Sequence, residues 1–578
     1  MPEAARPVAQ PVAKPLLILA AVHLEAGPEA VPLGAASVAS ALKAAFPGLA
    51  VALAESFVPG GAAGILAAVR AAAGKRRGAA GKRGGAITGV GFSVYSWNRH
   101  LCVEAARRLR RERPGLFLFC GGPDASALPG GLALAEGGPF DAVVLGEGER
   151  AASRLIGERF FPGRALPAAF TGPAGDLAAL PSPWLDGSLR AGAARTVLWE
   201  LARGCPYHCA YCYESRTVRK TVRNSAGSSV RDSVGYYPEE RLREELRLFI
   251  RRRVPSVSVL DPSFNAGNQR AVRILNMIGD ACQGTDRGSR PSIHWHFEVR
   301  AERLTREQVR GFARLGASLQ IGLQTSNPRA AELADRDFDR ERFLRGIRLL
   351  NAAGLSFGLD LIYGLPGDSL GGFRRSLGFA LSLYPNNLDI FRLAVLPGTA
   401  LAERAAAWGL DAEGQPPYSV LSTPDFSQAD LGRAERLAQA ADLFYNRGRA
   451  VAWFNQTLHP LGIKAAAFLE GFAGSLASRA ASGAASGDAA GSNTTAIEAM
   501  QLAYLEKKYR EARKDHLLPA VRDLVHYHGA WGRALAEGLE TEISLNYPPE
   551  LILGAEALDL ERFAARHQQR PGQRILIR

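Results

Sequence analysis

The sequence has little of several features that define large classes of protein. Six cysteines among 578 residues are too few for a disulfide scaffold, so we expect a reducing compartment. No apolar run reaches the ~20 residues that a membrane-spanning helix needs. The best short run, 16–22, lacks a basic flank followed by a cleavage site, so it does not predict a signal peptide. We therefore expect a cytoplasmic protein with no membrane partner.

The formal net charge is +14, but the sequence lacks the patterns that are typical of a nucleic-acid-binding surface. Its densest basic clusters, 75–83, 107–113 and 251–253, fall in a Gly/Ala loop and on two amphipathic helices with solvated faces. No aromatic-studded basic strand or recognition helix accompanies them. We expect no nucleic-acid partner.

A hydrophobic content of 47% supports ordinary globular cores, and the length suits about three or four domains.

Three of the cysteines stand close together. Cys205, Cys209 and Cys212 form a C-x₃-C-x₂-C motif, whereas Cys102, Cys120 and Cys282 are scattered and fit buried small hydrophobes. Three soft thiolates in a tight loop suit an iron–sulfur cluster, and a missing fourth cysteine leaves one iron open. A structural zinc ion needs four closed ligands. His208 is placed poorly to complete them, so the cluster is the favoured hypothesis.

This loop, with an aromatic residue, Tyr211, before its last cysteine, resembles the signature of the radical S-adenosylmethionine (SAM) enzymes. The resemblance implies a [4Fe–4S] cluster whose open iron binds the amino and carboxylate groups of SAM. It also implies an electron donor of the flavodoxin or ferredoxin type.

The first 156 residues alternate strands and helices, which predicts an α/β doubly wound parallel sheet. The expected strands are 16–22, 89–95, 116–120 and 142–145, with helices at 35–45 and 100–113. Ligands bind at the carboxyl ends of such strands. The candidate contacts there are Ser93, Tyr95, Trp97, Asn98, Gly121, Gly122, Gly146, Glu147 and Gly148. Each of them alone is also explained by turn chemistry.

Together, segments 32–35, 97–98, 121–123 and 146–149 resemble the cobalamin-binding domain that precedes many radical SAM domains. The resemblance implies bound cobalamin, held by the candidate contacts above. The Asp-x-His-x-x-Gly motif of many such domains is missing, because His100 lacks both the aspartate and the glycine. We therefore expect no protein imidazole on cobalt. A degenerate domain that serves as a scaffold or lid is the alternative.

The central segment predicts a second parallel structure. A Pro/Gly/Ala-rich connector at 157–194 leads to six strand candidates in 195–414, with helices between them. The expected strands are 196–202, 256–260, 293–299, 319–323, 357–363 and 388–396. This count agrees with the (β/α)6 partial TIM barrel of radical SAM enzymes. The cysteine loop follows the first strand, at the end of the barrel where active sites lie.

Four polar residues are candidate SAM contacts. Glu298, Gln324 and Asp360 are expected at the ends of later strands, and Arg336 within the helix that leaves the fourth strand. Their order is similar to that of the oxygen-independent coproporphyrinogen dehydrogenase branch of the family. This implies that Glu298 binds the methionine amino group, Gln324 and Asp360 the ribose, and Arg336 the carboxylate. Helix caps and a surface ion pair are the alternative roles.

Three further polar residues of the barrel are ambiguous. Asp261 could position SAM or substrate, or cap a helix. His294 and His296 share one strand face, where a hydrogen-bonded pair is favoured over a metal site because no third ligand is evident.

The tail, 415–578, predicts a mainly helical domain with a flexible insertion at 476–496. It resembles an uncharacterised carboxyl-terminal domain of one branch of cobalamin-type radical SAM proteins.

The whole sequence therefore predicts an α/β enzyme that cleaves SAM to a 5′-deoxyadenosyl radical and depends on cobalamin. The reaction expected from the resemblance is methylation of an unactivated carbon in a small-molecule or metabolite substrate. Radical oxidation, cyclisation or rearrangement without methyl transfer is the alternative reaction. A non-catalytic cluster or cobalamin carrier, such as a sensor, is the rival from another class.

Overall fold

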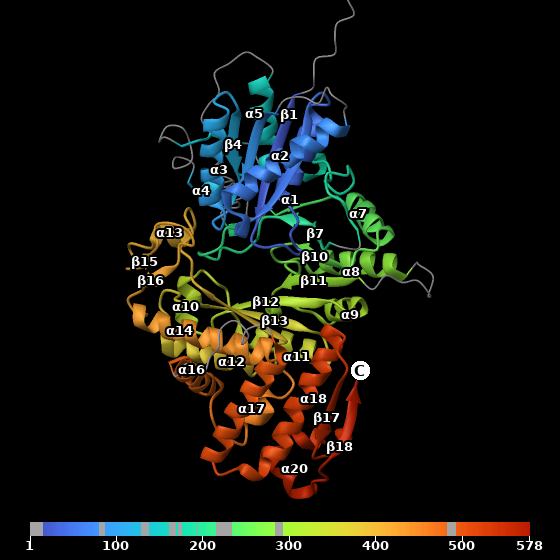
Figure 1. The fold of residues 1–578 in the computed structure, drawn as a ribbon, viewed down its shortest axis with the longest axis vertical. Coiled ribbons are helices and arrows are strands. Elements are labelled where there is room, and N and C mark those ends of the chain that lie inside the picture. The colour runs from blue at the N-terminus through green and yellow to red at the C-terminus, as the bar shows by residue number, and fades with distance from the viewer. Residues whose placement is uncertain are drawn as a thin grey trace, which may run out of the picture.

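The computed structural model describes residues 15–79, 87–128, 138–160, 169–171, 176–192, 195–215, 234–283, 293–481 and 493–578. The chain forms three parts that follow one another along the long axis of the molecule (Figure 1). An amino-terminal sheet domain lies at one end, a parallel sheet with its helices in the middle, and a helical part at the other end. Within these ranges no helix has the length and apolar character needed to cross a bilayer.

The amino-terminal part is a six-stranded sheet in the order β2-β1-β3-β4-β5-β6, parallel throughout. Its strands are β1 Leu16–His23, β2 Ala50–Phe57, β3 Ile87–Ser93, β4 Phe117–Gly121, β5 Ala142–Leu145 and β6 Ala169–Thr171. Its helices are α1 Leu33–Ala45, α2 Gly61–Ala79, α3 Arg99–Glu112, α4 Pro123–Ala127 and α5 Gly148–Phe160. One apolar core includes residues of α2 and α3 and the other includes residues of α1 and α5, so helices cover both faces. The predicted doubly wound sheet is confirmed.

Five elements of this part were not predicted, namely β2, α2, α4, α5 and β6. β2 and α2 lie in an alanine-rich stretch, 50–79, that offers little contrast between polar and apolar faces. β6 extends the sheet into the predicted connector. The order of the strands matters for function, because the chain moves outward in both directions from the neighbours β1 and β3. This pair is the topological switch point, beside which ligands of doubly wound sheets bind.

The central part is a second six-stranded sheet, in the order β14-β13-β12-β11-β10-β7, also parallel throughout. The strands are β7 Val197–Glu200, β10 Ser256–Leu260, β11 His294–Val299, β12 Ser318–Gln324, β13 Phe357–Tyr363 and β14 Asn387–Arg392. The helices are α7 Glu239–Arg251, α8 Asn268–Gln283, α9 Arg306–Leu315, α10 Pro328–Leu333, α11 Arg340–Ala352 and α12 Leu370–Leu381. Consecutive strands are neighbours, which confirms the predicted (β/α)6 partial barrel. The predicted strand 196–202 is divided, because β8 Ala202–Arg203 pairs antiparallel with β9 Gly235–Tyr236.

The two faces of these strands differ in burial. In β12, Leu319, Ile321 and Leu323 are buried, whereas the four residues between and around them are only half-buried. In β11, Phe297 packs edge-on against Phe312 of α9, while His294 and Glu298 on the other face are exposed. The outer face is thus the helix-packed core, and the inner face of the partial barrel is polar and open to solvent.

The carboxyl-terminal part is mainly helical, as predicted. After the barrel strands come α13 Ala400–Arg404, β15 Asp411–Ala412 and β16 Val420–Ser422, which lie on the side nearest the sheet domain (Figure 1). The helical part then consists of α14 Gln428–Ala441, α15 Phe454–Leu458, α16 Ala465–Ala481, α17 Thr494–Glu511, α18 Leu518–Glu537, β17 Thr541–Leu545, α19 Pro549–Ile552, α20 Leu560–Arg566 and β18 Gln573–Ile577. The prediction of a flexible insertion at 476–496 is wrong at both ends, where α16 extends to Ala481 and α17 begins at Thr494. Asn493 starts α17 by accepting hydrogen bonds from the backbone of Thr495 and Ala496. Residues 482–492 lie outside the described residues.

A buried triad joins the sheet domain to the segment that carries β15 and β16, which lies beside α13 (Figure 1). The Tyr418 hydroxyl donates to Asp124 of α4 at 2.9 Å and accepts from Arg99 of α3 at 3.1 Å. Asp124 and Tyr418 are each 1% exposed, so this junction excludes water. Because the partners are about 300 residues apart in sequence, folding of the junction needs both parts in place.

We predict that Tyr418→Phe lowers the free energy of unfolding by about 1.5–3 kcal/mol, the typical loss of a hydrogen bond to a charged group. Denaturant unfolding compares it with Tyr384→Phe, at a tyrosine that is 51% exposed and should change stability by at most about 0.5 kcal/mol. Equal losses in the two variants would show that the junction contributes nothing.

Candidate functional site

The three cysteines lie in a loop that follows β8 at the carboxyl end of the barrel. The Ser215 hydroxyl donates to the carbonyl oxygens of Cys209 and Cys212, at 3.0 and 2.7 Å. The backbone of Ala210 hydrogen-bonds Ala334 on one side and Leu401 on the other. The loop is therefore fixed by backbone contacts and presents its thiols from a rigid support.

Cationic side chains approach the middle cysteine. Cys209 is buried, and the Arg300 guanidinium donates to its sulfur at 3.8 Å. Arg336 also hydrogen-bonds Cys209. Burial raises the pKa of the Cys205 and Cys212 thiols to about 11. These thiols are therefore protonated near neutral pH unless a metal replaces the proton, which couples cluster binding to deprotonation.

The residues predicted to contact SAM come from neighbouring strands. Glu298 lies near the end of β11 and Gln324 ends β12, as expected. Asp360 differs from the expectation, since it lies in the middle of β13, three residues before its end. Its register partner on β12 is Gly322, where the Gln324 amide occupies the space that a side chain would fill. Gln324 and Asp360 are thus brought together on the inner face of the barrel.

Arg336 also departs from its predicted place. It lies in the loop after α10 rather than within a helix, and it is 8% exposed, which excludes the surface ion pair considered from sequence. Its guanidinium donates to the Gly322 carbonyl and lies 3.9 Å from the Glu302 carboxylate. Arg336 is therefore buried between the cysteine loop and β12.

The alternative role of helix caps is wrong for the two barrel acids. Thr305 caps α9, Asp339 caps α11 and Ser369 caps α12, so neither Glu298 nor Asp360 starts a helix. Asp261 forms an ion pair with Arg270 at 2.8 Å and accepts from the backbone of Ser263. This contact within its own segment supports a structural role for Asp261.

The inner face of the barrel carries two hydrogen-bonded polar groups, one at the amino ends of β11 and β12 and one in the middle of the strands. His294 and His296 both hydrogen-bond the Ser318 hydroxyl, at 3.0 and 3.1 Å, so they share a serine partner, and His294 is exposed rather than in the core. The Gln320 amide donates to Asp360 and, at 3.0 Å, to Asp389 of β14. Among the described residues, no three His, Cys, Asp or Glu side chains converge on a single metal ion.

The barrel acids have raised pKa values. Removal from water raises the pKa of Asp360 to about 7, and the neighbouring carboxylates of Asp389 and Glu298 add to the rise. The pKa of Glu298 is raised by the same desolvation and by Glu214 and Asp261. The ion pairs of the described residues give neither Glu298 nor Asp360 a lysine or arginine partner. Both acids thus face the inner side of the barrel without an ion-pair partner, although the Arg336 cation offsets part of the rise in the pKa of Asp360.

Two buried polar atoms without a hydrogen-bond partner indicate that these residues fit SAM. The buried Oε1 of Gln324 and the buried Nε of Arg336 have no hydrogen-bond partner. Buried polar atoms are rarely left unpaired. The unpaired acceptor of Gln324 and the unpaired donor of Arg336 lie next to the cysteine loop. They could therefore hydrogen-bond a polar ligand such as SAM.

In the sheet domain, the predicted loop after β3 is held at the switch point. Asn98 donates to the carbonyl oxygens of Val22 and Ser93 and accepts from the backbone of Tyr95. Tyr95 and Trp97 stack with ring centroids 4.3 Å apart, and Trp97 is 40% exposed. Asn98 therefore has a structural role, whereas the aromatic pair offers a flat, accessible surface next to β1 and β3.

The predicted glycines divide into two groups. A Cβ on Gly122 would lie 2.5 Å from the Val94 carbonyl, and a Cβ on Gly148 would lie 2.8 Å from Val38. Gly121 is similarly close to Val144. These glycines serve the packing of the loops themselves. Gly146 has a φ of 72° and no atom within 4 Å of its absent side chain, so it alone of the four borders open space.

A charge cluster joins the two sheets. Arg203, two residues before Cys205, forms ion pairs with Glu149 at 2.6 Å and Glu147 at 3.8 Å in the sheet domain. It also binds Glu200 at the end of β7 at 3.0 Å. The carboxyl ends of both sheets therefore meet at the cysteine loop. Sequence reasoning missed Arg203, because only the fold shows which distant acids it meets.

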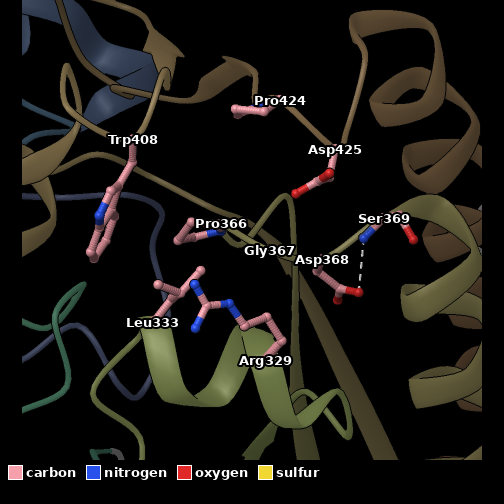
Figure 2. Close-up of a pocket in the computed structure, with 9 residues that line it drawn as sticks. All are labelled: Arg329, Leu333, Pro366, Gly367, Asp368, Ser369, Trp408, Pro424 and Asp425. Carbon is pink, nitrogen blue, oxygen red and sulfur yellow. Dashed lines mark hydrogen bonds between the residues drawn. The ribbon is translucent and has the colours of Figure 1, made fainter.

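A separate pocket of about 390 Å³ lies beside α10 and the loop after β13 (Figure 2). Arg329, Trp408 and Asp425 line it together with 366–369. None of the sequence-predicted site residues does so.

Comparison with known families gives two matches. Residues 199–380 match the family described as the Radical SAM superfamily, and residues 20–156 match the B12 binding domain. The chain therefore carries a radical SAM domain after a B12-binding domain, which confirms the resemblance drawn from sequence. The cofactors that these two families imply are the predicted ones, a [4Fe–4S] cluster, SAM and cobalamin.

Two relatives are each similar over 55% of the chain. The chain is 26% identical over 347 residues to the 2-(S-pantetheinyl)-carbapenam-3-carboxylate methyltransferase of Streptantibioticus cattleyicolor. It is 25% identical over 348 residues to the cobalamin-dependent radical SAM methyltransferase TokK of Streptomyces tokunonensis. Each match covers 55% of this chain and 49% of the relative, so the chain spans about half the length of these relatives.

Two solved structures share the fold. The radical SAM enzyme OxsB with aqua-cobalamin and SAM superposes with a TM-score of 0.54 at 14% identity, over 87% of this chain and 80% of that one. The methyltransferase TsrM of Kitasatospora setae, with tryptophan and a SAM analogue, gives 0.51 at 15% identity, over 71% and 81%.

Asp360 gives a prediction for pH. Its folded pKa of about 7 lies above the ordinary 3.8, so the folded state resists ionisation and loses stability as pH rises between these values. Asp360→Asn has no such loss. Its melting temperature relative to the parent should therefore increase from pH 4 to about 7 and then level off.

Thermal melting across this pH range checks the prediction, with Asp425→Asn, at an exposed aspartate, as control. A difference that stays constant or falls with pH would contradict it.

Proposed function

We propose that this chain, which joins a B12-binding domain to a radical SAM domain, is a cobalamin-dependent radical SAM methyltransferase. The observation that carries the proposal is the meeting of the two sheets. Arg203 draws Glu147 and Glu149 of one domain to the cysteine loop of the other. The loops that would hold cobalamin thus face the loop that would hold the cluster. Relatives that are named as methyltransferases support the reaction type.

In this proposal Cys205, Cys209 and Cys212 bind the cluster, and four barrel residues bind SAM. Glu298 meets the methionine amino group, Gln324 and Asp360 the ribose, and Arg336 the carboxylate. The burial of Arg336 beside Cys209 and the unpaired Oε1 of Gln324 support this assignment. Protonation of Asp360 near pH 7 would let it donate as well as accept a hydrogen bond.

The sheet domain would hold cobalamin at the switch point. Tyr95 and Trp97 would lie beneath the corrin in place of an imidazole, and Gly146 would leave room at its edge. Ser93, Asn98, Gly121, Gly122, Glu147 and Gly148 would shape the surrounding loops. When bound, the cluster and SAM supply a 5′-deoxyadenosyl radical that abstracts hydrogen, and cobalamin supplies the methyl group.

The expected partners are a small-molecule substrate and a flavodoxin- or ferredoxin-type reductant in the cytoplasm. The open polar inner face of the barrel supports a small, hydrogen-bonding substrate. The sequence predicts domain limits at about residues 156, 195 and 414. We propose to move the first limit to about residue 171, because β6 belongs to the sheet domain.

Anaerobic reconstitution with iron, sulfide, cobalamin and SAM tests the function, with SAM products separated by mass. The proposal expects both S-adenosylhomocysteine, from methyl donation, and 5′-deoxyadenosine, from radical formation. Cys209→Ala should abolish 5′-deoxyadenosine, whereas Cys282→Ala, outside the motif, should not. Formation of 5′-deoxyadenosine alone would favour radical chemistry without methyl transfer. Neither product from cluster-loaded protein would favour a non-catalytic carrier.

Gly146 gives a prediction for cobalamin. Gly146→Asn tolerates the left-handed backbone but fills open space, so it should weaken cobalamin binding about tenfold or more. Gly462→Asn is the matched control, because Gly462 has a φ of 63° and equally open surroundings in the helical part. Titration of the visible corrin spectrum measures both affinities. Equal affinity of the two variants for cobalamin would show that the loop at Gly146 does not contact the corrin.

A further inference from the structure

Arg300 follows β11 and points toward the cysteine loop from a rigid support. Its backbone N–H donates to Asn265 Oδ1, and its carbonyl accepts from Asn265 Nδ2, both at 2.9 Å. Asn265 is 1% exposed and Arg300 is 8% exposed. A pair of hydrogen bonds from one buried amide therefore fixes where the Arg300 side chain leaves the barrel.

The guanidinium contacts two residues of the cysteine motif. It lies over the Tyr207 ring, 3.5 Å from its centroid, and donates to Cys209 Sγ at 3.8 Å. Its other contact is the Asp337 carbonyl oxygen at 3.4 Å. Tyr207 thus orients a planar cation against the sulfur of Cys209.

Charge balance sets Arg300 apart from other arginines at this end of the barrel. Arg203, Arg241 and Arg270 each form an ion pair with a carboxylate within 3.0 Å. The ion pairs of the described residues include none for Arg300. A buried guanidinium without a counter-ion is strongly unfavourable. The thiolates of a bound cluster would supply the missing negative charge.

A fixed cation affects the two redox states of such a cluster unequally. Reduction adds one electron and therefore one negative charge, and the cation stabilises the more negative state. Net charge, hydrogen bonds to the sulfurs and solvent exposure set the potentials of these clusters. Arg300 acts on the first two of these, because it brings a positive charge and an N–H donor to Cys209.

We propose that Arg300 raises the reduction potential of the cluster bound by Cys205, Cys209 and Cys212, and so eases its one-electron reduction by the external donor. This inference rests on the proposed function, because it needs the cluster. Arg300 is a positioning residue in this role, because it acts on the cluster through Cys209 Sγ.

The test is a potentiometric titration of the reconstituted full chain, followed by the paramagnetic resonance of the reduced cluster. Arg300→Gln retains an N–H donor without charge, and Arg300→Lys retains the charge without the planar group. Arg303→Met is the matched control, because Arg303 is exposed on the same segment. Loss of the charge should make reduction on the order of tenfold less favourable, about 59 mV for one electron. Arg300→Lys should stay near the parent.

The outcomes separate this inference from the proposed function. An unchanged potential in an Arg300→Gln protein that holds its full iron content overturns the role of Arg300 alone. Equal shifts in the Gln and Lys variants also overturn it, since charge would then not be the cause. A parent protein that takes up no cluster overturns the proposed function and this inference together.

Discussion

The meeting of the two sheets depends on a buried ionic contact, that of Arg203 with Glu149. The pair joins β8, directly after the first barrel strand, to the first turn of α5, with Glu149 7% and Arg203 17% exposed. Breaking such a pair leaves an uncompensated buried charge, which typically costs about 3–5 kcal/mol. Because Arg203 is two residues from Cys205, the contact that fixes the domains also fixes the start of the cysteine loop.

Unbalanced charge is the second theme of the site. The inner barrel face carries Glu298 and Asp360 without an ion-pair partner among the described residues, while Arg300 lies on the cysteine side without a carboxylate. A protein that bound nothing here would gain little from leaving Arg300 buried and unpaired, since buried charges are stable when paired. The amino group of a zwitterionic cosubstrate would balance the acids, and an anionic cluster would balance Arg300. The polarity of the site is therefore complementary to the cofactors that its two families imply.

The sequence predicted the partial barrel well because its strands, such as Leu319–Leu323 within β12, alternate or concentrate apolar residues between clear helices. It failed where alanine dominates, at β2 and α2, since small residues hide the period. Glycine was ambiguous for another reason. Close approach of a ligand and close approach of the backbone both require it, and only the structure places the Val94 carbonyl against Gly122. Contacts between distant segments, such as Arg203 with Glu149, leave no local signal at all.

The Tyr418 junction bears on how such proteins diversify by exchange of whole domains. Tyr418 belongs to the segment after the barrel, yet its two partners, Arg99 and Asp124, belong to the amino-terminal sheet. A recombination that replaced only the sheet domain would leave a buried tyrosine hydroxyl and Arg203 facing foreign surfaces. Viable chimaeras would have to inherit matching residues on both sides. The two domains are therefore expected to descend together as one evolutionary unit.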